Sequence, residues 1–466
     1  MNKQTSQTVI VGGGFTGLFT ALYLSHQHYQ SSVILIDQND RFCFKPLLYE
    51  YFSAEMEDLQ VLPKFTELLE GSKVTFVQDK VEAVDLQQRE VKLNSGDIYK
   101  YDNLVLAVGS VPSYFNVQGA KESALPFYSQ KDAIAIDHHL YQNLQTALNT
   151  PDENTRCQLL TIAVVGGGPT GVEMSATLAD LLPHWYTAMG GNSQQIQIFL
   201  LNHGAEILQG DINSHLREIA TAQLQKRTRP VELLLGANVT AVLPNAVKYE
   251  QYGEIKTLPT CTTIWTAGTA THPLIENLAV PAAHRDHHGK LQVSSTLQLL
   301  DYPEVFAGGD CAVMVENPLP PTAQVAYQQG KAIAHNLKAL ELKQPLQSAQ
   351  VNIRGTLLKL GLNQAAANIY NLFEVTGEIA HLIRQGTYLE LLPTPIHNFQ
   401  VTTEWLNTEI FQRYLTSESA EKTAAKAVEM VGSAAISVLV ARKLWQMLGD
   451  KQNPQLQEGT LNREQA

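Results

Sequence analysis

Residues 9–37 read VIVGGGFTGLFTALYLSHQHYQSSVILID, and this stretch decides the fold class. An apolar run stops at three glycines, and the helical pattern of Leu18, Ala21 and Leu22 follows at once. This order predicts a buried parallel strand that turns sharply into a helix, with a second strand over 32–36. The stretch is therefore typical of one β-α-β unit of a dinucleotide-binding fold.

Three glycines of this stretch have the spacing of a phosphate-binding turn. Gly12 allows the tight turn, Gly14 lets the backbone approach a pyrophosphate, and Gly17 lets the helix pack closely on the strand. The helix N-terminus offers free N–H groups and a positive dipole to the phosphates. Asp37 ends the second strand, where a carboxylate accepts hydrogen bonds from ribose hydroxyls. Together these residues predict a nucleotide site, whereas the glycines alone could form only a tight turn.

The same pattern occurs a second time in the chain. Residues 163–172, AVVGGGPTGV, repeat the core of the first motif 154 positions further on. The second copy supplies the equivalent positions in the order Gly166, Gly168, Gly171 and, after the next strand, Asn202. We therefore expect an α/β chain with two Rossmann-like dinucleotide-binding domains, one for a flavin and one for a nicotinamide.

Further strands end where the backbone can approach a ligand. Residues 101–109, YDNLVLAVG, and 263–269, TIWTAGT, are apolar strands that run into Gly109 and Gly268. The stretch VFAGGD ends in Asp310, whose carboxylate can hold a polyol hydroxyl.

A long helix is predicted directly after this stretch. The segment PPT at 320–322 is a helix start signal, and the helical pattern runs over 323–340. Gln324 and Gln328 lie four residues apart and so share one face. They are either solvated glutamines or polar groups beside an apolar ligand.

Composition narrows the class of protein. The chain has 466 residues, 44% of them hydrophobic, which is enough for about three domains and for a core that can bury a cofactor. The net charge is −12, so a nucleic-acid partner is not expected, because phosphate backbones require a concentrated basic surface. The four cysteines, Cys43, Cys157, Cys261 and Cys311, form no CxxC pair, and we expect small core residues rather than a metal site or a disulfide framework.

At this point the chain resembles the type II NAD(P)H:quinone oxidoreductases, single-chain membrane-associated flavoproteins, over about residues 8–405. The resemblance rests on VGGGFTGL with Asp37, FKPLLYE (44–50), VVGGGPTGVE (164–173), FAGGDCA (306–312), PTAQVAYQQG (321–330) and RGTLLKLG (354–361). FKPLLYE and LLPTPIHNFQVTTEWL (391–406) are most similar to the cyanobacterial and plastid branch linked to demethylphylloquinone or plastoquinone.

The resemblance implies the ligands and the domain organisation. It implies FAD along Gly12, Gly14, Gly17, Asp37, Gly109 and Asp310, NAD(P)H along Gly166, Gly168, Gly171 and Glu173, and the quinone head beside Gln324 and Gln328. Phe15, Thr16, Lys45, Asn202 and Gly268 complete the candidate cofactor-binding residues. The expected domains are residues 1–115 with 285–345 for FAD, 116–284 for NAD(P)H, and 346–466 for quinone and membrane.

The implied reaction passes a hydride from NAD(P)H to FAD and two electrons to a membrane quinone, without proton pumping, and requires no metal. Glu173 is the candidate group that orients the rings or relays a proton. Its alternative role is to end an exposed helical turn.

Three other functions are alternatives for a chain with these motifs. A disulfide reductase needs a redox cysteine pair against the flavin, and Cys43 stands alone in that region. A sulfide:quinone oxidoreductase would have to use Cys157 and Cys311. A redox-sensing binding protein would use the same two nucleotides without steady turnover.

The C-terminal region predicts attachment to a membrane surface. A helix is expected over 424–448, where Ile436, Leu439, Val440, Leu444, Met447 and Leu448 form an apolar stripe with Trp445 at its edge. The longest uncharged run, 430–441, is shorter than the roughly 20 residues that span a bilayer, so the helix should lie on the surface. We expect a peripheral protein on the cytoplasmic face of a thylakoid or plasma membrane. The alternative is a helix docked on the protein itself or on a second subunit, as in a homodimer.

The second motif also bears on the choice of electron donor. Asn202 replaces the acidic residue that would bind the adenosine ribose and repel a 2′-phosphate. NADPH should therefore be accepted at least as well as NADH, although no arginine is adjacent and only His203 could add positive charge.

Overall fold

The computed structural model describes residues 6–52, 61–210, 212–369 and 373–393. The chain divides into two compact units, residues 1–375 and 376–466. The predicted membrane helix over 424–448 lies outside the described residues. Among the residues described, no helix is both long enough and apolar enough to cross a membrane.

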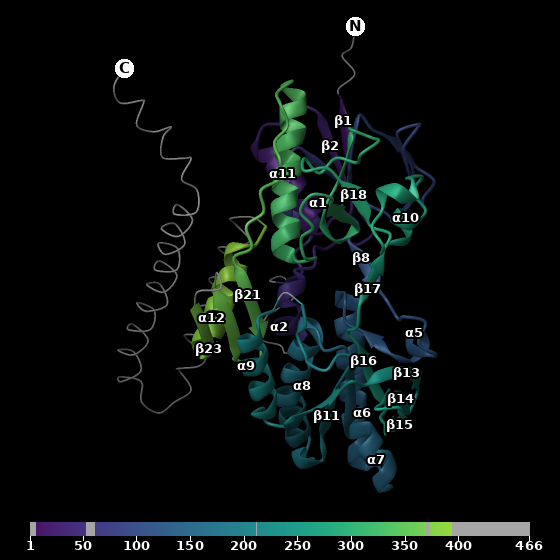
Figure 1. Cartoon of the computed structure of the whole chain (residues 1–466), viewed down its shortest axis with the longest axis vertical. Coiled ribbons are helices and arrows are strands. Elements are labelled where there is room, and N and C mark those ends of the chain that lie inside the picture. Colours follow the sequence, from purple (N-terminus) through teal and green to yellow (C-terminus); the bar gives the residue numbers. More distant parts are fainter. Residues whose placement is uncertain (1–5, 53–60, 211, 370–372, 394–466) are drawn as a thin grey trace, which may run out of the picture. The chain divides into compact units, whose positions relative to one another are not determined.

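A five-stranded parallel sheet contains the first glycine motif (Figure 1). Its strands lie in the order β19 (Val305–Ala307), β7 (Asn103–Leu106), β1 (Gln7–Val11), β2 (Ser32–Asp37) and β3 (Val74–Gln78). β1 is central, with Val9 paired to Ile34 on one side and Leu104 on the other. Because both faces of a parallel sheet are covered, its strands are nearly continuous apolar runs. The predicted strand after the glycine motif is confirmed as β2.

A second five-stranded parallel sheet has the same plan around the second motif. Its order is β12 (Val231–Leu235), β11 (Gln197–Asn202), β10 (Thr161–Val165), β16 (Thr262–Trp265) and β9 (Leu125–Pro126). Val164 of β10 pairs with Leu200 and Ile264, as Val9 pairs in the first sheet. The internal repeat in the sequence therefore corresponds to two copies of one Rossmann-like arrangement.

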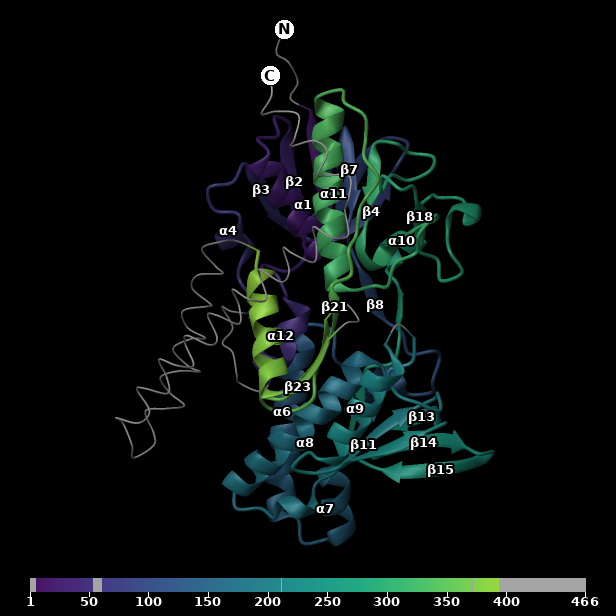
Figure 2. The ribbon, with the colours of Figure 1, turned by 60° about the vertical axis from the view of Figure 1, so that its left-hand side comes forward.

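Long helices pack beside the two sheets. The first domain has α1 (Phe15–His26) and α11 (Ala323–Glu341), which lie side by side in Figures 1 and 2. The second has α6 (Gln130–Asn149), α7 (Glu153–Leu160), α8 (Pro169–Ala188) and α9 (Ser214–Gln225). α11 confirms the helix predicted after the two prolines, and its N-cap is Thr322, whose hydroxyl accepts a hydrogen bond from Val325 N.

Short elements complete the first unit. The short helices are α2 (Leu48–Phe52), α4 (Phe65–Leu68), α5 (Ala120–Ser123) and α10 (Pro273–Glu276), with 3₁₀ turns at Lys45–Leu47 and Gly309–Cys311. Antiparallel sheets are formed by β4 (Val81–Asp85), β5 (Glu90–Leu93) and β6 (Ile98–Lys100), and by β13 (Asn238–Leu243), β14 (Ala246–Gln251) and β15 (Glu254–Pro259). Two pairs are β8 (Ser110–Pro112) with β17 (Thr269–Thr271), and β18 (Leu291–Val293) with β20 (Ala312–Met314), while β21 (Gly355–Lys359) and β22 (Ala365–Ile369) form a three-stranded sheet with β23 (Phe373–Gly377).

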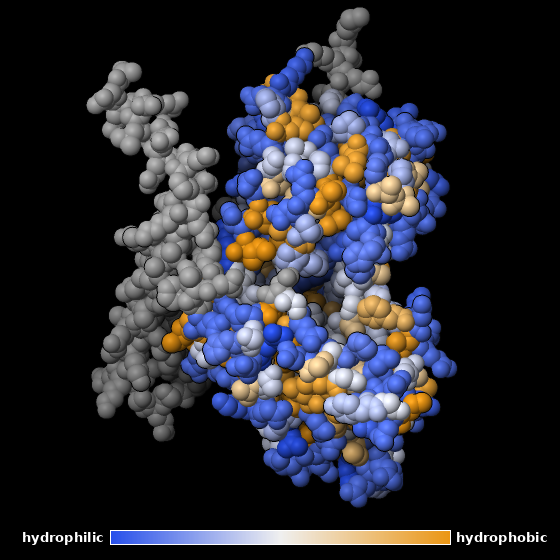
Figure 3. All heavy atoms as spheres, in the orientation of Figure 1, coloured by the Kyte–Doolittle hydropathy of each residue, from blue (hydrophilic) through white to orange (hydrophobic). Residues whose placement is uncertain are grey.

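The boundary between the units falls within β23 (Phe373–Gly377), and the described part of the second unit is mainly α12 (Glu378–Glu390). The face shown in Figure 3 is largely hydrophilic, with scattered hydrophobic groups, and its surface is hollowed between the two dinucleotide domains.

Candidate active site

The first glycine turn forms an open cradle at the carboxyl end of β1. Gly12 has a φ of +99°, and its N–H donates to Ile36 O at 2.8 Å, so the chain turns directly beside β2. A Cβ on Gly17 would lie 1.9 Å from Gly12 O and would clash with it. Glycine is therefore required at this close contact between helix and strand. A Cβ on Gly14 would meet no atom within 4 Å. The backbone at Gly14 is therefore open to a ligand at the N-terminus of α1.

Asp37 stands beside this cradle with its carboxylate held by backbone groups. Its Oδ2 accepts from Gly13 N at 2.7 Å and its Oδ1 from Asn39 N at 2.8 Å. Burial raises the pKa of this carboxyl, and the two backbone hydrogen bonds oppose the rise. The carboxylate is thus fixed at the end of β2, where an adenosine ribose would lie.

A second group of contacts leads to Asp310, which lies in the turn after β19. Ser110 Oγ donates to Asp310 Oδ2 at 3.0 Å, and Tyr128 OH donates to Ser110 O at 2.6 Å. Lys45 Nζ lies 3.2 Å from the centroid of the Tyr128 ring, within cation–π range. Four distant segments of the chain are therefore joined in a series of contacts that ends at the Asp310 carboxylate, a group that suits the polyol chain of a flavin.

Phe15 and Thr16, both proposed from the motif, have structural contacts. The Phe15 ring packs edge-on against Phe42 and Phe44, and Thr16 Oγ1 donates to Ala326 O of α11 at 3.0 Å. Their side chains support the cradle, and their backbone forms its rim.

The second cradle repeats the geometry of the first. Gly166 has a φ of +116°, a Cβ on Gly171 would lie 1.8 Å from Gly166 O, and Gly168 is open. Asn202 Oδ1 accepts from Gly167 N at 3.1 Å, as Asp37 does from Gly13. The motif residues of both copies therefore serve the same backbone roles, with a neutral amide in place of the carboxylate in the second.

A cavity of about 240 Å³ lies between the two cradles. The first domain contributes Lys45 and Asp310, while the second contributes Tyr128, Trp265 and Gly268. The remaining lining residues are Leu48, Tyr49, Pro112, Phe127, Thr170, Thr266, Thr269 and Pro321. Gly109 does not line this cavity, although it precedes Ser110 with a φ of +69°. Aromatic and apolar walls with a few polar groups are typical of sites for planar cofactors.

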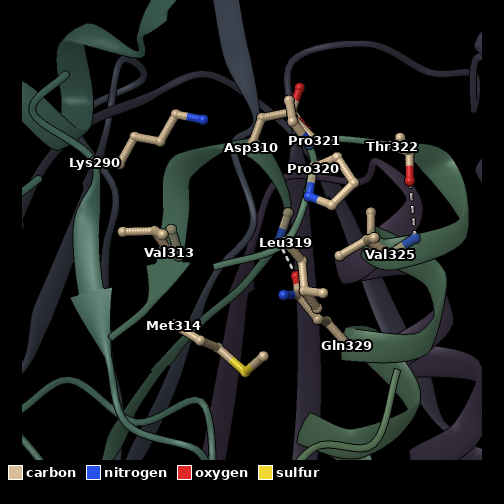
Figure 4. A pocket seen from close by; sticks show the side chains of 13 residues that line it. Lys290, Asp310, Val313, Met314, Leu319, Pro320, Pro321, Thr322, Val325 and Gln329 are labelled. Carbon is tan, nitrogen blue, oxygen red and sulfur yellow. Dashed lines mark hydrogen bonds between the residues drawn. The ribbon is translucent and has the colours of Figure 1, made fainter. Parts of the chain in front are cut away.

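Asp310 also faces a narrower pocket of about 10 Å³ beside the start of α11 (Figure 4). Lys290, Val313 and Met314 form one side, and Pro320, Pro321 and Thr322 form another. Gln329 reaches across to accept a hydrogen bond from Gly309 N at 2.7 Å. Gln329, which the sequence did not single out, thus fixes the turn that carries Asp310.

Glu173 is buried, so its alternative role at an exposed helical turn is wrong. Its Oε1 accepts from Lys359 N of β21 at 2.7 Å, and Thr170, one turn earlier, lines the cavity instead. Lys359 Nζ lies 3.4 Å from Glu50 Oε1, and both of these side chains are fully buried. Sequence reasoning missed this charged cluster, although FKPLLYE and RGTLLKLG contain two of its members.

The amide groups of Gln324 and Gln328 bind backbone, so their interpretation as solvated side chains is wrong. Gln324 Oε1 accepts from Arg354 N at 3.0 Å, and Gln328 Oε1 accepts from Asn352 N at 2.9 Å. Their Nε2 groups donate to Gly355 O and Asn352 O. The two side chains fasten the segment before β21 to α11.

The cysteines do not form a redox pair. Cys311 is buried and its thiol donates to Leu106 O at 3.4 Å, while burial raises its pKa to about 11. Cys157 is exposed, so its prediction as a core residue is wrong, and it precedes the amino end of β10. Because ligands of open parallel sheets bind at the carboxyl ends of the strands, Cys157 is on the wrong edge to flank a flavin with Cys311.

Comparison with known proteins defines the class of this two-cradle site. Residues 6–330 match the family described as pyridine nucleotide-disulphide oxidoreductase. The match includes both glycine motifs, Asp310 and the start of α11, and the chain belongs to this family.

Relatives place the chain more narrowly. Demethylphylloquinone reductase NdbB of Synechocystis is 33% identical, with 87% of this chain and 97% of that protein covered. Type II NADH:quinone oxidoreductase of Haemophilus influenzae is 30% identical, with coverage of 78% and 87%. Within the wider family, this chain is thus a member of the type II NAD(P)H:quinone oxidoreductases, as its motifs indicated.

The fold is also similar to that of a solved structure. The structure of NDH2 from Plasmodium falciparum in complex with NADH superposes with a TM-score of 0.79 at 19% identity, covering 88% of this chain and 99% of that one. Its family and its relatives make the chain an enzyme that uses FAD and NAD(P)H. Both cradles fit these cofactors, because Gly14 and Gly168 are open at the helix N-termini, while Gly12, Gly17, Gly166 and Gly171 are closed by backbone atoms.

Proposed function

We propose that this enzyme transfers a hydride from NADPH or NADH to FAD and two electrons onward to a membrane quinone, either demethylphylloquinone or plastoquinone. The observation that carries the proposal is the cavity shared by the two cradles, which Asp310 lines from one domain and Thr170 from the other. Two planar rings bound at these cradles would meet there. The relatives are a demethylphylloquinone reductase and an NADH:quinone oxidoreductase, which supports a quinone as the final acceptor.

In this proposal the side chains position the rings and exclude water. Ser110 holds Asp310 for the flavin side, and Trp265 Nε1 donates to Ser113 O at 2.7 Å, which fixes the wall on the nicotinamide side. FAD, when bound, supplies the two-electron chemistry. Glu173 acts through Lys359 N as a positioning residue between α8 and β21.

Quinone approach is assigned to the N-terminal end of α11. Gln324 and Gln328 hold residues 352–355 there, so they shape this entrance through the backbone that they bind. Pro321, at the same end of the helix, lines the shared cavity. In this proposal, residues 1–115 with 285–345 bind FAD, residues 116–284 bind NAD(P)H, and 346–466 serve the quinone and the membrane.

Anaerobic stopped-flow absorbance tests the reaction. The flavin absorbance should bleach with NADH or NADPH and should return when a short-chain quinone is added. A flavin that never bleaches would refute the proposal. Bleaching without return of colour on quinone addition would favour the alternative of a redox sensor.

For the electron donor, we propose that NADPH is accepted at least as well as NADH, because Asn202 places no negative charge beside the adenosine ribose. Asn202→Glu should shift the ratio of kcat/KM toward NADH. A ratio that stays unchanged, or moves toward NADPH, would contradict this assignment.

Peripheral membrane attachment through the C-terminal region completes the proposal, on the cytoplasmic face of a thylakoid or plasma membrane. Deleting residues 417–466 should preserve the flavin and the activity with a water-soluble quinone. Co-sedimentation with liposomes and activity with a long-tailed quinone should fall. Unchanged liposome binding would refute the attachment, and loss of folded protein would favour a docked helix.

A further inference from the structure

The loop after β11 contains charged groups that the reaction does not use. Asn202 Nδ2 donates to Gly204 O at 3.1 Å and to Glu206 O at 2.7 Å, while its Oδ1 holds Gly167 N. The side chain that ends β11 is thus committed to shaping the loop. Besides the neutral Asn202, the groups that the loop presents can then contribute to selection at the adenosine ribose.

Glu206 and Arg217 are such groups. Arg217 belongs to the first turns of α9, and its NH1 donates to Glu206 Oε2 at 2.5 Å. The Glu206 side chain is 61% exposed and the Arg217 side chain 26%. Arg217 Nε is buried and has no hydrogen-bond partner among the described residues. Because Nε is buried, an anion can reach the guanidinium only through its terminal nitrogens, one of which holds Glu206.

Arg217 is better placed to bind an anion than the two histidines near the loop, His215 and His203. His215, two residues earlier, has its Nε2 3.1 Å from Glu374 Oε2 and its Nδ1 3.8 Å from Glu218 Oε2. His203 is exposed in the loop itself. Arginine binds phosphate through two parallel N–H groups, and an exposed carboxylate pair is weak enough to be exchanged for it.

We infer that Arg217 binds the 2′-phosphate of NADPH, and that Arg217 keeps its ion pair with Glu206 when the ribose carries a free 2′-hydroxyl. The inference rests on the proposed use of NAD(P)H and names the residues that select between the two donors. Sequence reasoning could not find Arg217, because it lies fifteen positions beyond Asn202 and meets the loop only through the fold.

Equilibrium binding to the FAD-loaded enzyme tests the inference. Calorimetry would compare 2′-phospho-ADP-ribose with ADP-ribose, neither of which can reduce the flavin. Arg217→Gln should weaken the phosphorylated ligand by about tenfold or more, as expected for loss of a charge-assisted hydrogen bond, and should change ADP-ribose affinity by less than about twofold. Glu206→Gln should tighten the phosphorylated ligand by roughly threefold to tenfold, because it removes the competing carboxylate.

Glu218→Gln is the matched control, because Glu218 is a 78% exposed carboxylate on the same helix that lies beside His215, and no ion pair joins it to Arg217 among the described residues. It should change neither affinity by more than about twofold. An unchanged affinity ratio in Arg217→Gln would overturn the inference. Should Arg217→Gln fail to fold, Glu206→Gln decides alone, and an unaltered ratio there overturns it equally. Flavin bleaching by NADH in the wild type reports separately on the proposed function.

Discussion

Glycine is required in the cradles for two different reasons, and the reasons predict different consequences of substitution. At Gly17 and Gly171 a Cβ would collide with a backbone carbonyl, so those residues are required for folding. At Gly14 and Gly168 a Cβ meets open space, so the protein can fold with a side chain there. The requirement at the open positions comes from the ligand.

Gly14→Val should therefore purify as folded protein with little or no FAD, because the valine methyls occupy the place of the pyrophosphate. The flavin-to-protein absorbance ratio measures this, and circular dichroism checks the fold. Gly168→Val, the same change in the second cradle, is the control and should keep FAD while losing NAD(P)H-dependent bleaching. A Gly14→Val protein with full flavin would contradict the assignment of the first cradle.

At the scale of elements, the contact between α1 and α11 joins residues over 300 positions apart. Thr16 Oγ1 donates to Ala326 O, and Thr20 Oγ1 donates to Gly330 O at 3.1 Å. A Cβ on Gly330 would lie 2.5 Å from Thr16 O. The helices approach so closely because Gly330 has no side chain.

Gly330→Ala sets two effects against each other. Alanine favours a helix over glycine by about 1 kcal/mol, but overpacking costs about 1–3 kcal/mol, and a backbone carbonyl cannot rotate away. We expect the free energy of unfolding to fall by up to about 2 kcal/mol, measured by urea denaturation. His335→Ala, on the exposed side of α11, should have little effect. A Gly330→Ala protein more stable than the wild type would show that the helices separate without cost.

For the whole molecule, two half-buried histidines, His139 and His272, predict how stability depends on pH. Burial lowers the pKa of His139, whose Nε2 lies 3.1 Å from Cys261 O, and also that of His272, the N-cap of α10. Below the unfolded value of 6.5, the unfolded chain binds protons that the folded chain refuses. Their contribution to stability is thus complete above pH 6.5 and is lost as the pH falls below it.

Urea denaturation at intervals between pH 8 and pH 5 should show this loss. The double variant His139→Gln/His272→Asn should lose less stability than the wild type over the acidic part of the range, because it has no histidine to protonate at these sites. Asn at 272 can still cap α10. If the two proteins lost the same free energy of unfolding at acid pH, other titrating groups would dominate the pH dependence.

Local patterns in the sequence were sufficient for the two β-α-β units, the helix after Thr322 and the duplicated cradle. Each follows from the spacing of apolar residues and glycines within about forty positions, and those spacings act through neighbouring backbone atoms. The cofactor class follows from the same local chemistry.

The tertiary structure decided which distant side chains meet. Ser110 reaches Asp310 across 200 positions, Glu173 binds the backbone of Lys359, and Glu206 pairs with Arg217 on the next helix. Spacing cannot predict such contacts, because they depend on the order in which strands pair and on the direction in which each loop returns. For the same reason Asn202 could be recognised as the counterpart of Asp37, while the loop that its amide holds in place became visible only in the folded chain.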